Sequence, residues 1–154
     1  MARQPRLSLP GELHYVIQRG HNRQGVFEDD ADRETYLKML GDAADQYGVA
    51  IHAYALLLSD VHLLATPPAA ESMSRLLQSL GRRYVAAINR RHARVGTLWA
   101  GRFRAGLVDG SSLGAQALVA LETVPVRLGL VAAAEDWHWS SAAHHLGRDR
   151  RAHV

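Results

Sequence analysis

The residues with the clearest chemical potential are Asp60 and His62, which lie one residue apart within the stretch VAIHAYALLLSDVHLLAT. Its apolar first half, residues 49–58, predicts a strand buried on both faces, and residues 61–66 predict a second strand after a Ser-Asp turn. Because side chains alternate along a strand, Asp60 and His62 should point to the same face. A carboxylate beside an imidazole could hold a divalent ion such as Mg²⁺ or Mn²⁺, and the imidazole favours Mn²⁺. The alternative is that Asp60 only forms the turn and His62 is a hydrogen-bonded, partly buried histidine.

Basic residues form the second chemical feature, because residues 75–108 contain eight arginines and neither aspartate nor glutamate. Lys38 is the one lysine among the 18 basic residues, whereas the net charge of the whole chain is only +3. The guanidinium group binds phosphate in a bidentate manner, so this segment predicts a surface that meets a polyanion, with a solvated helix face as the alternative. A polar loop at residues 20–25 adds one more arginine near the end of a predicted strand. The arginines expected to form the surface are Arg19, Arg23, Arg82, Arg83, Arg90, Arg91, Arg102 and Arg104.

Length and composition predict one domain over residues 1–154, with 47% hydrophobic residues available for a core. The sequence contains no cysteine, which excludes disulfides and thiolate metal sites. We expect no membrane span, since the apolar runs are too short, and no secretory signal, since the first residues lack an apolar segment. A cytoplasmic protein is therefore expected.

Periodicity and turn signals place the remaining elements around the two central strands. A helix that begins after acidic capping residues precedes the pair of strands. A long helix with an apolar stripe follows the pair. The predicted order β-α-β-β-α-β-α favours an α+β fold in which helices cover one face of an antiparallel sheet. The predicted elements are strand 13–19, helix 31–48, strands 49–58 and 61–66, helix 72–92, strand 102–108, and a third helix from Asp109 that ends near Pro125.

Several segments, in order and at matching spacing, resemble the REP-associated and insertion-sequence-type tyrosine transposases. These are the single-tyrosine branch of the HUH single-strand DNA nucleases. The resemblance implies a ferredoxin-like domain, usually a homodimer, that binds single-stranded or hairpin DNA and cuts it through a 5′-phosphotyrosine with a divalent metal. The segments that carry it are PGELHYVIQRGHNRQGVF, IHAYALLLSDVHLLATP, LGRRYVAAINRR, GTLWAGRFRAG, VPVRLGLV and WHWSS.

The catalytic positions implied by this resemblance are altered. The family has two histidines flanking a hydrophobic residue, and here the first position is Asp60. Aligned on the Pro-Val-Arg of the family segment Y-I-E-L-N-P-V-R-A-G, the tyrosine position is Ala120 and the asparagine position one helical turn later is Val124. The resemblance implies that these two positions face Asp60 and His62 across a pocket. Alanine offers no nucleophile, so no phosphotyrosine can form there, and the loss of a polar ligand weakens the metal site. None of the remaining tyrosines is an obvious substitute: Tyr15, Tyr36, Tyr47, Tyr54 and Tyr84.

Three hypotheses follow from these observations. In the first, a DNA-binding transposase scaffold has lost strand cleavage, which both the arginine segment and Ala120 favour. In the second, an active nuclease uses Asp60 and His62 with an unusual nucleophile such as water. In the third, the scaffold serves as a dimerisation or regulatory module that has no nucleic-acid role.

Overall fold

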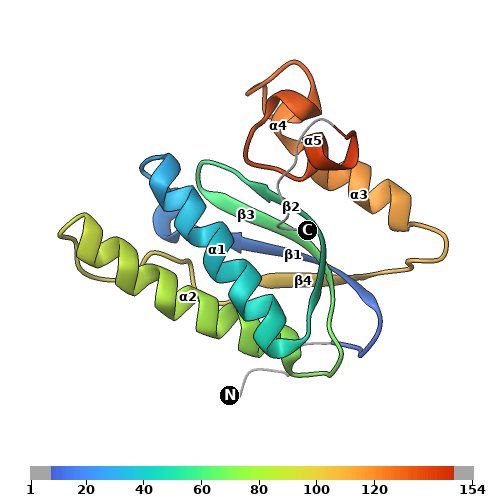
Figure 1. Ribbon diagram of the computed structural model, residues 1–154, viewed down its shortest axis with the longest axis horizontal. Coiled ribbons are helices and arrows are strands. Elements are labelled where there is room, and N and C mark those ends of the chain that lie inside the picture. Colours follow the sequence, from blue (N-terminus) through green and yellow to red (C-terminus); the bar gives the residue numbers. More distant parts are fainter. Residues whose placement is uncertain (1–7, 148–154) are drawn as a thin grey trace.

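The structure, a computed structural model, describes residues 8–147 as four strands and several helices (Figure 1). The outermost parts of the predicted 1–154 domain lie outside these described residues. Two long helices and one shorter helix are the main helical elements, and short helical turns fill the connections and the C-terminal segment. The elements are β1 (Leu13–Arg19), η1 (His21–Arg23), α1 (Asp30–Tyr47), β2 (Ala50–Leu56), β3 (Asp60–Thr66), α2 (Ser72–Arg91), β4 (Arg104–Val108), α3 (Gly114–Glu122), α4 (Val124–Arg127), η2 (Ala134–Asp136) and α5 (Ala142–His145).

All neighbouring strands are antiparallel and the sheet has the order β2-β3-β1-β4. Strands β3 and β1 therefore lie inside the sheet, and β2 and β4 form its edges. The apolar run 49–58, predicted to be a strand buried on both faces, forms the edge strand β2, whose first residues are partly exposed. The α+β prediction is confirmed, and most elements lie within two residues of their predicted bounds, whereas α3 begins at Gly114, five residues later than predicted. One of these differences matters for the site: Asp60 is the first residue of β3 and does not belong to the preceding turn.

The two faces of the sheet are covered by different helices. On one face, β-strand residues such as Val16 and Leu63 join α1 and α2 in the main hydrophobic core. On the other face, alanines of β2 and Leu64 of β3 pack against Leu121 and Val124 from the α3–α4 region. The expectation that helices cover one face is thus wrong for α3, which lies on the other side of the sheet from α1 and α2 (Figure 1). The small side chains of Ala53 and Ala55 on that face leave room for this helix.

The C-terminal segment closes the free edge of β2. The amide of Leu56 donates to the carbonyl of Trp139 and the amide of Ser141 donates to the carbonyl of Tyr54. The indole of Trp137 adds a hydrogen bond of 3.0 Å to the Leu56 carbonyl. These bonds satisfy backbone groups that an exposed edge strand would leave open. Among residues 8–147, no helix is long and apolar enough to span a bilayer.

Candidate functional site

Asp60 and His62 lie on the same face of β3, as the strand alternation predicts. Their nearest side-chain atoms, Asp60 Oδ2 and His62 Nε2, are 4.0 Å apart, and the imidazole is more buried than the carboxylate. The register places Arg19 of β1 directly opposite Asp60 and Ile17 opposite His62. Directly opposed residues share a face, so the Arg19 side chain lies on the same face as the pair.

Tyr15 is a member of this site that the sequence did not identify. Its hydroxyl lies 2.7 Å from Nδ1 of His62, and the two rings meet edge to face at 5.7 Å. Tyr15 and His62 come from neighbouring strands and are 47 residues apart in the chain. Alternation within residues 13–19 does predict the face that Tyr15 shares with Ile17, but only the β1–β3 register brings it to His62.

The electrostatic surroundings keep both rings neutral. Burial lowers the pKa of His62, and the positive charges of Arg19 and Arg127 lower it further, against the opposing effect of Asp60. Burial also raises the pKa of the Tyr15 hydroxyl, which Arg127 partly offsets. Arg127 therefore lies within electrostatic reach of both rings, although it belongs to α4.

The α3–α4 segment carries the two altered positions predicted to face Asp60 and His62. Val124 is buried in the same apolar cluster as Ala55, the residue of β2 paired with His62. Ala120 is half-buried and lines a cavity of about 400 Å³ together with Arg127. Arg127 reaches back along the helix, where its Nη2 donates to the carbonyl of Ala120 at 2.8 Å. Asp60 lines a different cavity, so Asp60 and Ala120 do not line the same one.

The second hollow, of about 430 Å³, joins the start of β3 to the polar loop. The loop is held in place by backbone hydrogen bonds from Gly20 to Ser59 and from His21 to Leu98. Asn22 and Arg23 both have positive φ angles, 53° and 55°, which turn the chain sharply at this point. The hollow is lined by Arg19, Gly20, Asn22, Arg23, Ser59, Asp60 and Ala100.

The donor atoms at this site fit a weakly held metal ion and not a complete coordination shell. Asp60 and His62 offer one carboxylate and one imidazole, and Val124 offers no donor at the third predicted position. Glu122, the nearest carboxylate on α3, is turned away and accepts hydrogen bonds from Ser141 and His145. Two protein ligands leave most of the coordination sphere of Mg²⁺ or Mn²⁺ to water or phosphate.

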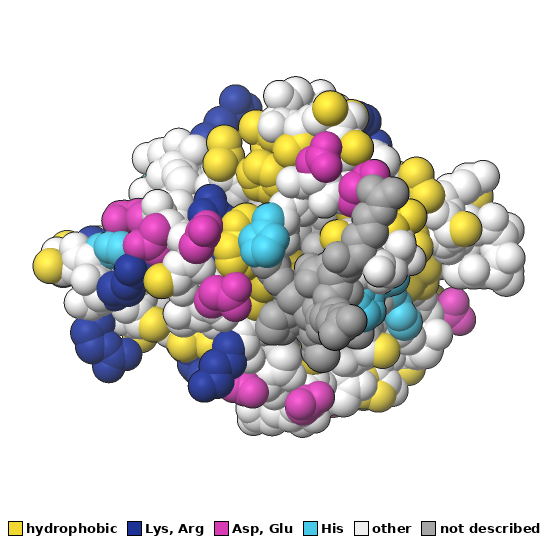
Figure 2. Space-filling model, turned by 45° about the horizontal axis from the view of Figure 1, so that its top comes forward, with side chains coloured by type: hydrophobic (Ala, Val, Ile, Leu, Met, Phe, Trp, Pro, Cys, Tyr) yellow, Lys and Arg dark blue, Asp and Glu magenta, His cyan; other side chains and the backbone are white. Residues whose placement is uncertain are grey.

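The predicted arginine surface is only partly continuous. Arg82, Arg83 and Arg90 are exposed along α2, which covers the sheet face opposite to Asp60 and His62. Arg104 of β4 is paired with Ile17, so it lies on the Asp60 face, where Arg19 also lies. Arg102 lines a third cavity, beside Gln18 and Phe103. Figure 2 shows basic side chains at the left and along the top of the visible face, with acidic side chains among those at the left.

Arg91 differs from the other arginines because it is bound to two carboxylates at the N-terminus of α1, those of the N-cap Asp29 and of Asp32. Its guanidinium forms a bidentate pair with Asp29, at 2.6 and 2.7 Å, and also contacts the fully buried Asp32. His92 completes the cluster by bonding to Asp32 and Glu28. Ligand atoms of Asp29, Asp32 and His92 lie within 4.8 Å of one another. Since Arg91 already neutralises both aspartates, this cluster ties the start of α1 to the end of α2.

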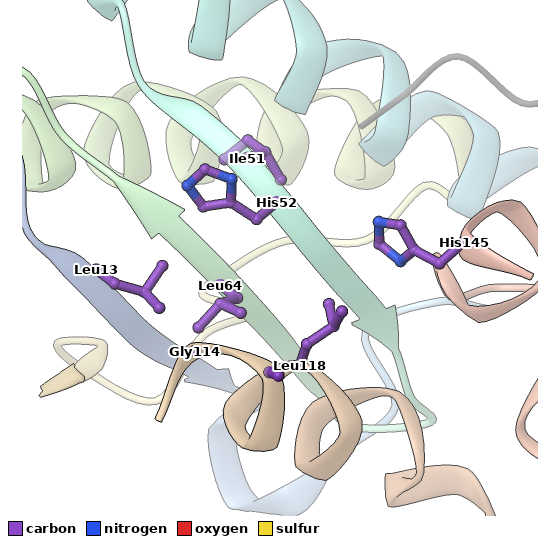
Figure 3. Close-up of a pocket in the computed structure, with 8 residues that line it drawn as sticks. Leu13, Ile51, His52, Leu64, Gly114, Leu118 and His145 are labelled. Carbon is purple, nitrogen blue, oxygen red and sulfur yellow. The ribbon is translucent and has the colours of Figure 1, made fainter. Parts of the chain in front are cut away.

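A larger cavity of about 510 Å³ lies at the opposite end of α3 (Figure 3). Leucines from the sheet and from α3 line it, and His52 and His145 stand at its rim. His52 bonds to Thr66 and His145 bonds to Glu122, so each imidazole has a partner. The cavity includes neither Asp60 nor Ala120 and is separate from the site described above.

Comparisons with known proteins give one family and one fold. Residues 11–116, more than half of the chain, match the family described as "Transposase IS200 like"; the match includes Asp60 and His62 and ends before Ala120. No curated protein matches the chain. A solved REP-associated tyrosine transposase bound to a REP hairpin has a similar fold, with a TM-score of 0.80 and 16% identity, over 96% of this chain and 87% of that chain. A putative transposase from Deinococcus radiodurans is also similar, with a TM-score of 0.52 and 20% identity, over 77% of this chain and 96% of that chain.

Proposed function

This chain belongs to the IS200-like transposase family, and from that premise we propose that it binds single-stranded or hairpin DNA without cutting it through a tyrosine. The observation that carries the proposal is the combination, on one scaffold, of exposed arginines with an alanine at position 120. The first feature supports phosphate binding, and the second removes the nucleophile of the family's strand cleavage and joining.

The proposed DNA contacts are the predicted arginines other than Arg91. A guanidinium that already holds two carboxylates would have to release them to take a phosphate, so Arg91 is left out. The remaining side chains are exposed, and among residues 8–147 no ion pair engages any of them: Arg19, Arg23, Arg82, Arg83, Arg90, Arg102 and Arg104.

The absence of cleavage follows from the tyrosines that remain. Tyr36, Tyr54 and Tyr84 are buried in the main core and cannot reach DNA. Tyr47, the last residue of α1, is partly buried against the same core, on the face of the sheet opposite to Asp60 and His62. Tyr15 is the one beside His62, but burial raises the pKa of its hydroxyl, which disfavours the tyrosinate needed for attack on phosphorus. A metal bound by Asp60 and His62 would polarise a phosphate, yet it would not supply the missing nucleophile.

A second candidate function is metal-dependent hydrolysis, in which water replaces the tyrosine. The observation in its favour is that Asp60 and His62 do lie together on an accessible face of the sheet. The two candidates differ in their products: hydrolysis would shorten the DNA without leaving protein attached, whereas the proposed function leaves the DNA intact.

The test of DNA binding is a filter-binding titration with hairpin and single-stranded oligonucleotides over a range of salt concentrations. Arg82→Gln with Arg83→Gln should weaken binding to every sequence and lower the salt slope by about 0.7 for each single-strand phosphate that is no longer neutralised. Lys38→Gln, on the exposed side of α1, removes one charge outside the proposed surface and is the matched control. Failure of the unmodified chain to bind DNA at low salt would refute the proposal. The homodimer implied by the family is proposed as well, and sedimentation of the free and DNA-bound protein would test it.

A further inference from the structure

We propose that the cavity between α2 and the end of β1 takes one unpaired base of the bound DNA and recognises its keto oxygen. The inference rests on the proposed DNA-binding function and adds a base contact to it, since phosphate contacts alone carry no sequence information. This α2–β1 cavity has a volume of about 400 Å³ and lies on the sheet face opposite to Asp60 and His62. It is lined by Gln18, Ser74, Leu77, Gln78, Gly101, Arg102 and Phe103.

The observation that carries the proposal is the amide nitrogen of Gln18. This side chain lines the cavity and is more than nine-tenths buried. The hydroxyl of Tyr36, on α1, lies 3.5 Å from the amide oxygen, whereas the amide nitrogen faces α2, 3.7 Å from the point where a Cβ of Gly81 would lie. Among residues 8–147 this nitrogen donates to no protein acceptor. A donor that is so nearly buried is costly to leave unpaired, so the cavity favours a ligand with an acceptor atom.

A second unpaired donor lies beside the first. The indole nitrogen of Trp99 is buried and has no hydrogen-bond partner within the described part of the chain. It lies 3.9 Å from the same point at Gly81, so both donors belong to the wall between α2 and β1. Of the described residues that line the cavity, none is acidic, and the guanidinium of Arg102 adds further donors. The site therefore offers donors and a positive charge to a ligand that presents acceptors.

The remaining lining residues suit a flat base that is attached to a phosphate backbone. Phe103 supplies an aromatic ring, on which any base can stack. Ser74 and Gln78 line the cavity one helical turn apart, and the exposed Arg82 follows one turn later on the same side of α2. A strand whose phosphate contacts Arg82 can thus place the adjoining base in the cavity.

Hydrogen-bond chemistry selects among the four bases. Guanine and thymine present a keto oxygen at the position where adenine and cytosine present an amino group. An amino group directed at the NH₂ of Gln18 would place donor against donor, whereas a keto oxygen accepts from it. The cavity should therefore prefer guanine and thymine.

The experiment measures binding of hairpin oligonucleotides with a single-stranded extension of adenines that contains one thymine. The thymine is moved along the extension and, in a second set, is placed as a single-base bulge in the stem. At each position the thymine is then replaced with guanine, adenine, cytosine or an abasic residue. At one position the two keto bases should bind about fivefold more tightly than adenine or cytosine. The abasic residue should bind about tenfold more weakly than thymine, because the stacking is lost.

Two variants separate the hydrogen bond from the stacking. Gln18→Met keeps a side chain of similar length without the donor, so it should remove the preference for keto bases and retain the effect of the abasic residue. Phe103→Leu should reduce the effect of the abasic residue. Lys38→Gln is the control and should retain both effects. As a direct readout, 5-iodouracil at the preferred position should crosslink on irradiation to the peptide that contains Phe103.

The outcomes separate the inference from the proposed function. Thermal unfolding by circular dichroism checks that the variants are folded; if Gln18→Met is not, the base series and the crosslink with the unmodified protein decide. If the protein binds DNA but all bases bind alike, if folded Gln18→Met keeps the full preference, or if the crosslink forms outside the cavity, the inference is overturned while the proposed function stands. If the protein binds no DNA at low salt, the proposed function fails and the inference fails with it.

Discussion

Replacing Arg91 with glutamine separates a structural role of this arginine from a role in DNA binding. Its partner Asp32 is a fully buried carboxylate, and loss of a charged partner from such a group commonly costs about 3–5 kcal/mol. The cost here should be lower, because Asp32 keeps its bonds to His92 and to the Glu28 amide and the Arg91 side chain is 42% exposed. We therefore expect a loss of about 2 kcal/mol in the free energy of unfolding.

The assay is urea and thermal unfolding followed by circular dichroism. A loss of that size corresponds to a fall of about 4–8 °C in Tm for a domain of this length. Arg82→Gln, an exposed arginine of the same helix, is the matched control and should change stability by less than about 0.5 kcal/mol. The two variants should rank the other way round in DNA affinity: Arg82→Gln should weaken binding more than Arg91→Gln.

The pH dependence of the free energy of unfolding is a second measurement of the same ion pairs. Hydrogen bonds from Arg91 lower the pKa of Asp29 to about 2, from an ordinary value of 3.8. A lowered carboxyl pKa stabilises the folded state above the ordinary value, and this stabilisation is lost as pH falls toward 2. The stability difference between the unmodified protein and Arg91→Gln should therefore shrink below about pH 4. An Arg91→Gln variant as stable as the control, with DNA binding weakened as in Arg82→Gln, would refute the reasoning.

Gly20→Ala should destabilise the polar loop and weaken DNA binding, because an added Cβ would lie 2.3 Å from the backbone carbonyl of Gln24; a melting curve and a binding titration check this. Tyr84→Phe should cost about 1–2 kcal/mol in urea unfolding, since it leaves the buried carbonyl of Val26 without its 2.6 Å hydrogen bond. His62 should titrate by NMR below its ordinary pKa of 6.5, because burial disfavours the imidazolium; the neutral ring is favoured in the folded state, so its contribution to stability falls as pH drops below about 6.5. A His62 midpoint above 6.5 would contradict this description of the site.

Local sequence patterns predicted the helices and strands well because the type and the ends of an element depend mainly on residues close together in the chain. The alternation in residues 13–19 reflects one fully covered face, and the structure confirms it. The apolar run 49–58 predicted a strand buried on both faces, and β2 is buried in this way only over its second half. Gly48 follows the last residue of α1 with a left-handed φ of 68°, the conformation in which glycine commonly ends a helix. The expectation that helices cover only one face of the sheet was wrong for α3, because no local sequence pattern indicates which face of the sheet a helix will cover.

Long-range contacts explain what the sequence could not show at the site. Asp60 and His62 are close in sequence and were identified together, whereas Tyr15 joins them only through the β1–β3 register. Arg91 was assigned to the DNA surface by its neighbours in the chain, yet its partners on α1 lie about 60 residues earlier. The charge of a side chain can be read from sequence, but its partner depends on the packing of α1 against α2.

The central claim is that the scaffold can bind DNA and lacks only the groups for covalent cleavage, and a repair series tests it most directly. Ala120→Tyr, followed by addition of Asp60→His and Val124→Asn, restores the nucleophile and then the metal ligands. Each variant is incubated with hairpin DNA and Mn²⁺, and covalent protein–DNA adducts are detected on a denaturing gel. The triple variant with phenylalanine at position 120 in place of tyrosine is the matched control.

We expect an adduct with the triple variant, and none with the phenylalanine control or with the unmodified protein, because only the first combines a hydroxyl with a complete ligand set. Removal of a covalent nucleophile leaves only the residual rate that binding and electrostatics provide, so the contrast should span orders of magnitude. A covalent adduct formed by the unmodified chain would contradict the claim and would mean that its nucleophile lies at another residue.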